Sequence, residues 1–118
     1  MEMAEILKSV KDLQRQEKTI ELAPGLVLTL STLGYGEQLD CMSELEKKKD
    51  IGNVQFMQEA QMSTLARATR SVNGKVFSLP EMTDIYKSMQ FTVVQKIHEI
   101  YAEMLKQQES TLEYLKKN

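Results

Sequence analysis

The sequence predicts a single α+β domain over residues 1–118. It is mostly α, with a small N-terminal β-hairpin packed on a bundle of four to five helices and a long C-terminal helix. Apolar residues recur at helical spacing through most of the chain, and this period changes to alternation between residues 18 and 31. The 118 residues are 42% hydrophobic and 27% charged, which suits one domain with one modest core.

The first predicted helix covers residues 3–16 and is amphipathic. Its apolar face carries Met3, Ile6, Leu7, Val10 and Leu13. A β-hairpin is predicted over residues 18–31, because Pro24 and Gly25 suit the central positions of a type II turn, in which glycine supplies the positive φ. Two strands alone are marginal, so we expect a helix to cover their shared apolar face. That face is expected to carry Ile20, Leu22, Leu26, Leu28 and Leu30.

Helices over residues 36–49, 54–70 and 80–89 are predicted next. Asn53 is the expected N-cap of the helix over 54–70, which is the most apolar helix and is expected to be central to the core. Arg67 and Arg70 lie in its expected last turn, where cations complement the helix dipole.

A tight reversal at Asn73-Gly74 is predicted next. Asn-Gly favours a type I′ turn, because both central residues of that turn need positive φ. Ser78 and Glu81 form a capping box that starts the helix over 80–89.

The last helix is predicted over residues 92–116 and carries an apolar seam with a period close to the 3.5 residues of a coiled coil. The seam residues are our candidate partner-binding or homo-oligomer contacts: Val94, Ile97, Tyr101, Leu105, Leu112 and Leu115. The polar segment after residue 107 fits either a frayed tail or a docking arm. We predict that Leu105→Glu impairs partner binding far more than folding, because the end of this helix is expected to extend beyond the core.

The composition argues against several classes of partner. The 15 basic and 17 acidic residues are scattered and give a net charge of -2, so no basic patch is expected to hold nucleic acid. Apolar runs are too short to span a bilayer, and we expect no membrane partner. The single cysteine, Cys41, and the absence of a signal-peptide pattern predict a cytoplasmic protein. The eight methionines fit either buried gap-filling or an adaptable partner surface.

The motifs of catalysis are missing, so we predict no enzyme activity, no catalytic residue, no cofactor and no metal site. Gly34-Tyr35-Gly36 lacks the third glycine of a dinucleotide loop, and Gly74-Lys75 lacks the remainder of a phosphate loop. His98 has no carboxylate one turn before it and is predicted to be a surface side chain. Cys41 has no CxxC partner and is predicted to be a buried or half-buried structural thiol.

Two short sequence motifs carry a family resemblance that covers residues 18–90. Thr32-Leu33-Gly34-Tyr35-Gly36-Glu37 follows the hairpin, and Val72-Asn73-Gly74-Lys75-Val76 precedes a short acidic helix. In this order the chain resembles the tail assembly chaperones of tailed bacteriophages and the related baseplate hub chaperones. The resemblance implies a small protein of the host cytoplasm that binds an aggregation-prone tail component, such as the tape-measure or baseplate hub protein, and is absent from the finished particle.

Two other functions fit the same residues. The first is a structural tail or baseplate subunit, in which the C-terminal seam makes a permanent oligomer. The second is a small phage-encoded regulator that docks on a host protein. In all three functions the protein binds another macromolecule through an apolar helical surface.

Overall fold

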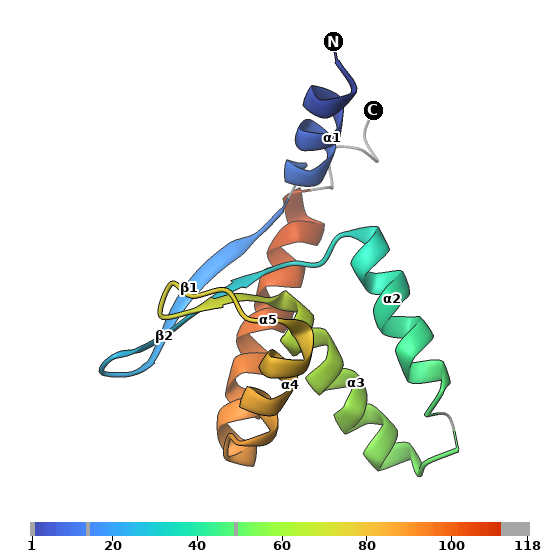
Figure 1. Cartoon of the computed structure of the whole chain (residues 1–118), viewed down its shortest axis with the longest axis vertical. Helices are drawn as coiled ribbons and strands as arrows, with labels where there is room; N and C mark the ends of the chain where they lie inside the picture. Colours follow the sequence, from blue (N-terminus) through green and yellow to red (C-terminus); the bar gives the residue numbers. More distant parts are fainter. Residues whose placement is uncertain (1, 14, 49, 112–118) are drawn as a thin grey trace.

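The computed structural model describes residues 2–13, 15–48 and 50–111, which form five helices and a three-stranded antiparallel sheet (Figure 1). In chain order the elements are α1 (Met3–Asp12), β1 (Glu17–Ala23), β2 (Leu26–Ser31), α2 (Tyr35–Glu46), α3 (Asn53–Ala68), β3 (Thr69–Val72), α4 (Leu79–Lys87) and α5 (Phe91–Thr111). The predicted class, α+β and mostly α with an N-terminal hairpin and a long C-terminal helix, is confirmed.

The sheet has the order β1-β2-β3, so β2 lies in the centre. Ile20 of β1 pairs with Leu28, which is fully buried. Gly25, with φ of 82°, supplies the positive φ that the predicted Pro-Gly turn needs. Leu26 departs from the predicted apolar face, because the register shifts between Glu21 and Ala23 and Leu26 is left 37% exposed.

The third strand is a difference from the sequence prediction. The helix predicted over 54–70 ends at Ala68, and Thr69–Val72 instead pairs with β2. The predicted tight reversal is present, since Asn73 and Gly74 have φ of 53° and 78°. This reversal follows strand β3 rather than the end of a helix. Asn73 fastens this turn to β2, because its Oδ1 accepts from Val27 N at 2.8 Å and its N donates to the Val27 carbonyl at 2.7 Å.

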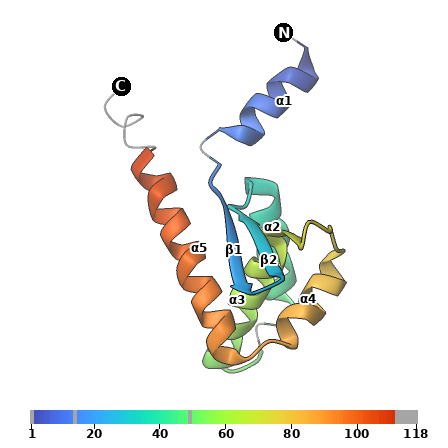
Figure 2. The ribbon, with the colours of Figure 1, turned by 90° about the vertical axis from the view of Figure 1, so that its left-hand side faces the viewer.

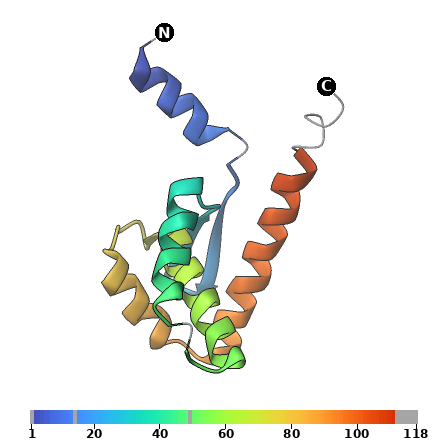
Figure 3. The ribbon, with the colours of Figure 1, turned by 90° about the vertical axis from the view of Figure 1, so that its right-hand side faces the viewer.

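The core lies where β2, the second half of α3, α4 and α5 meet. Figures 2 and 3 show the strands running between α5 and α4. Leu65, Met82 and Ile97 are fully buried there. The prediction that the third helix is central holds for its second half only, because Val54 and Met57 in its first half are 73% and 64% exposed.

The helix ends show how far local signals determine boundaries. The capping box is confirmed, because Ser78 Oγ accepts from Glu81 N and Glu81 Oε1 accepts from Ser78 N. The predicted Asn53 cap is wrong, because Gly52 is the N-cap and Asn53 is already helical. α2 and α4 end at Glu46 and Lys87, two or three residues before their predicted ends.

The first helix ends at Asp12 rather than at residue 16, and none of its residues is buried. It stands away from the body of the molecule, beyond the end of α5 that is nearest the C-terminus (Figures 2 and 3). The predicted end of the last helix at residue 116 lies outside the described residues. Among the described residues, no helix has both the length and the hydropathy that crossing a bilayer requires.

Candidate functional site

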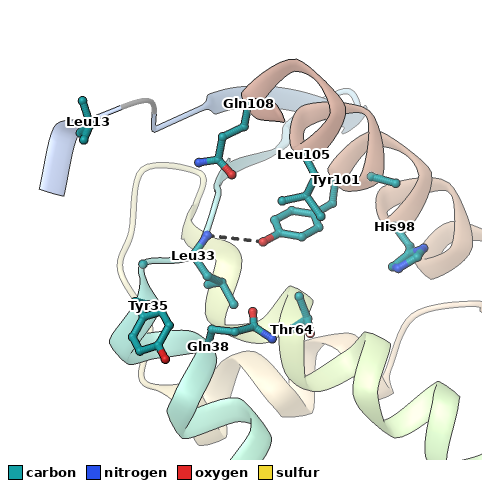
Figure 4. A pocket seen from close by; sticks show the side chains of 11 residues that line it. Leu13, Leu33, Tyr35, Gln38, Thr64, His98, Tyr101, Leu105 and Gln108 are labelled. Carbon is teal, nitrogen blue, oxygen red and sulfur yellow. Dashed lines mark hydrogen bonds between the residues drawn. The ribbon is translucent and has the colours of Figure 1, made fainter. Parts of the chain in front are cut away.

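A groove of about 810 Å³ opens between the first turn of α2 and the second half of α5. Figure 4 shows Tyr101 and Leu105 on α5 facing Leu33 and the start of α2 across this space, with Thr64 of α3 at its base. Leu13, just beyond α1, lines one end. We call this space the α2–α5 groove. Its aliphatic and aromatic walls suit a hydrophobic ligand surface.

Two hydrogen-bonded positions fix the shape of the groove. The Tyr101 hydroxyl accepts from Leu33 N at 3.4 Å, which ties α5 to the loop before α2. Burial raises the pKa of the Tyr101 hydroxyl above its ordinary value. The Thr32 hydroxyl accepts from Gln16 N at 3.1 Å and from Gln108 Nε2 at 3.3 Å. These hydrogen bonds join three separate segments, which are α5, Gln16 before β1, and the Thr32-Leu33 loop before α2.

A row of exposed apolar side chains continues from the groove along α2. Tyr35, Leu39 and Met42 follow one another at spacings of four and three, which places them on one helix face. They are 81%, 47% and 56% exposed. We call these three residues the α2 stripe. Together with the groove it forms an extended apolar surface of the kind that marks protein-binding sites.

The predicted C-terminal seam is not a continuous surface in the described residues. Ile97 and Tyr101 are 0% and 4% exposed and belong to the protein's own core, and Val94 is half-buried against that core. The prediction is therefore wrong for Val94 and Ile97, because a helix packed on its own domain shows the same apolar period as one packed on a partner. Tyr101 is largely covered by the core and also lines the α2–α5 groove. Leu105 is 38% exposed and lines the groove, so it remains a candidate contact.

The last two predicted contacts, Leu112 and Leu115, lie outside the described residues. Sequence reasoning missed the groove and the α2 stripe, because Tyr35 was considered only within the Gly34-Tyr35-Gly36 run and the segment that carries the family resemblance. The spacing of Tyr35, Leu39 and Met42 was the signal that could have indicated the stripe. The groove itself has no local signal, since its walls come from segments that are distant in the chain.

Several polar contacts join α2 to α3. Cys41 is buried, as predicted, and its thiol donates to Ser63 Oγ at 3.3 Å. Ser63 Oγ in turn donates to Glu44, whose carboxylate pairs with Arg67 at 2.6 Å. Burial acts to raise the pKa of Glu44, but the hydrogen bond and charge of Arg67 hold this pKa below its ordinary value. Lys48 adds an ion pair to Glu59 at 3.0 Å.

A further ion pair, between Glu37 and Arg70, positions the first turn of α2, which forms the groove wall. Glu37 accepts two hydrogen bonds from the Arg70 guanidinium, at 2.6 and 2.9 Å, and a third from Gly34 N at 3.0 Å. The hydrogen bonds from Arg70, which outweigh the effect of burial, lower the pKa of Glu37 below its ordinary value of 4.5. A bidentate pair of this kind fixes orientation as well as distance. Glu37 therefore joins the helix start to β3.

We expect Glu37→Gln to lower the free energy of unfolding by about 1 kcal/mol at neutral pH, because the pair with Arg70 is partly exposed and screened by solvent. A carboxyl group with a pKa lowered on folding stabilises the fold above its unfolded pKa, and this contribution is lost as the pH falls through the folded pKa. The difference between wild type and variant should therefore shrink below pH 4.5. Urea unfolding at neutral and acid pH measures it.

Glu21→Gln provides the control, because Glu21 is an exposed carboxylate on β1. It should change stability by less than about 0.5 kcal/mol at either pH. A Glu37→Gln deficit that stays the same at acid pH would show that the charge of Glu37 is not the source of its contribution.

Titratable side chains near the groove are few. His98, which was predicted to be a surface side chain, is half-buried and lines the groove from α5. Within residues 2–13, 15–48 and 50–111, no three His, Cys, Asp or Glu side chains are grouped as a metal ion needs.

Comparison of the chain with protein-family models, with curated proteins and with solved structures gave no match.

Proposed function

We propose that this protein is a non-enzymatic assembly chaperone of the bacteriophage-tail type, which binds an aggregation-prone tape-measure or baseplate hub protein in the host cytoplasm. The observation that carries the proposal is the extent of apolar surface on one small domain. The α2–α5 groove, the α2 stripe and the apolar face of α1 are all accessible. Surfaces of this kind on a folded domain mark sites that bind other proteins.

The groove suggests how the client is held. An amphipathic client helix lies between α2 and α5 and places its apolar side chains against Leu33 and Leu105, as in other helix-in-groove complexes. Tyr35 gives the wall a large, rigid aromatic anchor, and such residues dominate the binding energy of many interfaces. Met42 extends the surface with a flexible side chain that adapts to irregular partners. The site needs no charged ligand group, which suits a client that aggregates through apolar segments.

The test is co-expression with the tape-measure or baseplate hub protein of the same phage. The wild-type chain is expected to raise the soluble fraction of the client severalfold and to co-purify with it. Tyr35→Glu places a charge on the groove wall, where desolvation makes it costly in the complex, and should reduce the soluble client to the level without chaperone. The substitution is compatible with folding, because Tyr35 is 81% exposed in a first helical turn, which tolerates acidic residues.

Val54→Glu is the matched control. Val54 is also an exposed apolar residue in a first helical turn, but it does not line the groove, and α3 begins at the opposite end of the α2–α3 pair from the start of α2 (Figure 1). This variant should rescue the client as well as the wild type does. The proposal fails if neither tail component becomes more soluble, or if both variants lose rescue equally. Stoichiometric amounts of the chain in purified phage particles, detected by mass spectrometry, would indicate a structural subunit instead.

A further inference from the structure

His98 is the side chain of the α2–α5 groove whose type changes charge near neutral pH. It is half-buried and lies on the α5 wall with Tyr101 and Leu105 (Figure 4). Among the described residues, none forms a hydrogen bond or an ion pair with its imidazole, and no buried side-chain nitrogen lacks a partner. The ring nitrogens of His98 therefore reach water in the free protein.

The side chains packed around His98 are uncharged. Its neighbours three and four positions away on α5, which share its helix face, are Val94, Gln95, Tyr101 and Ala102. Across the groove, α3 contributes Thr64 and α2 contributes Gln38. The groove lining thus offers an imidazolium ion no carboxylate as a partner.

The charged side chains near the groove are engaged elsewhere. Three ion pairs hold them, which are Glu37 with Arg70, Glu44 with Arg67, and Glu99 with Lys96. Asp40 of α2 lines a different hollow, beside Arg70. Glu103 and Lys106 of α5 are exposed and do not line the groove. The other titratable groups close to the groove are the hydroxyls of Tyr35 and Tyr101 and the buried thiol of Cys41.

We propose that His98 makes the groove a pH-sensitive site, which holds the client helix while the imidazole is neutral and releases it on acidification. The inference rests on the proposed function and adds the regulation of its site. An apolar helix that fills the groove covers the imidazole and removes its water. A neutral ring tolerates this loss far better than a charged ring, because an unpaired charge is costly to bury. Client binding therefore opposes protonation of His98, and by linkage protonation weakens client binding.

The expected effect is about tenfold in the client dissociation constant between pH 7.5 and pH 5.5, since histidine side chains change charge at about pH 6.5. Acid unfolding does not contribute in this range. The pKa values of Glu37 and Glu44, whose ion pairs hold α2 in place, are lowered below the ordinary 4.5, so both carboxylates stay charged at pH 5.5.

The test is a titration of the purified full chain with a helix-containing segment of its tail component at the two pH values. The wild type should bind about tenfold more weakly at pH 5.5. His98→Gln keeps a polar, uncharged side chain at both pH values and should change less than about twofold. Glu99→Gln is the matched control on α5. It removes an exposed charge outside the groove and should keep the wild-type pH dependence.

A second measurement needs no variant. His98 is the single histidine of the chain, so its ring-proton NMR signals in an isotope-labelled chain are identified directly. Its titration midpoint should move to lower pH when the unlabelled segment is bound. A midpoint that stays in place or rises overturns the inference, and a rise would mean that the client brings a carboxylate to the ring.

The two proposals fail in different ways. Binding with the same pH dependence in the wild type and in His98→Gln overturns the pH-sensitive site and leaves the proposed function standing. Absence of binding by the wild type at pH 7.5 refutes the proposed function, and the pH-sensitive site with it. Circular dichroism at both pH values verifies that each variant is folded.

Discussion

Ile97→Ala is expected to destabilise the fold by about 2–5 kcal/mol, because it removes three buried carbon atoms and leaves a cavity in the core. Ile97 is 0% exposed and belongs to the same buried cluster as Leu65 and Leu28. For a domain of this size, such a loss is a large part of the total stability. Urea unfolding followed by circular dichroism should show a clearly lower midpoint with an unchanged slope.

Phe91→Ala serves as the control on the same helix. Phe91 is the first residue of α5 and is 62% exposed, so its truncation should cost less than about 0.5 kcal/mol. If Ile97→Ala were as mild as Phe91→Ala, then Ile97 would face a partner, as the seam pattern in the sequence predicted. A large loss in the isolated chain places it in the monomer core.

The elements with strong local signals were predicted from sequence. The β-hairpin depends on alternation and on Gly25, and the start of α4 depends on the capping box between Ser78 and Glu81. Each signal lies within a few residues and determines the local backbone conformation without distant contacts. The fold class followed from these elements, although the exact ends of the helices did not.

β3 could not be predicted in the same way. Thr69–Val72 has four residues, includes Arg70, and directly follows a helix, so neither period is long enough to identify it. What makes it a strand is its pairing with β2, together with the contacts between Asn73 and Val27, which are 46 residues apart. The contact between Arg70 and Glu37 could not be predicted from the sequence either, because these residues are 33 positions apart.

The candidate site illustrates a further limit. Periodicity in α5 identified an apolar face but could not say what covers it. In the structure Ile97 is covered by the protein's own core, whereas Leu105, two turns later, lines an open groove. The difference depends on where α2 begins and α3 ends relative to α5, which is a tertiary property. Only the structure separates a core residue from a contact residue on one helix face.

Leu105→Glu is the substitution expected to have the largest effect on binding. A carboxylate on the groove wall stays hydrated in the free protein, where Leu105 is 38% exposed, but it must lose water when an apolar helix fills the groove. A cost of about 2 kcal/mol corresponds to about thirtyfold weaker binding. Titration of the purified chain with a helix-containing segment of its tail component measures this loss.

The same variant should lose less than about 0.5 kcal/mol in unfolding free energy, because glutamate is a good helix former and reaches solvent at this position. Leu105→Met keeps the volume and the apolar character of the side chain and should bind nearly as the wild type does. Equal losses of stability and binding in Leu105→Glu would mean that Leu105 supports the monomer rather than contacts a partner. Loss of binding alone would identify the groove as the surface where another helix docks, and it would separate the function of α5 from its role in the core.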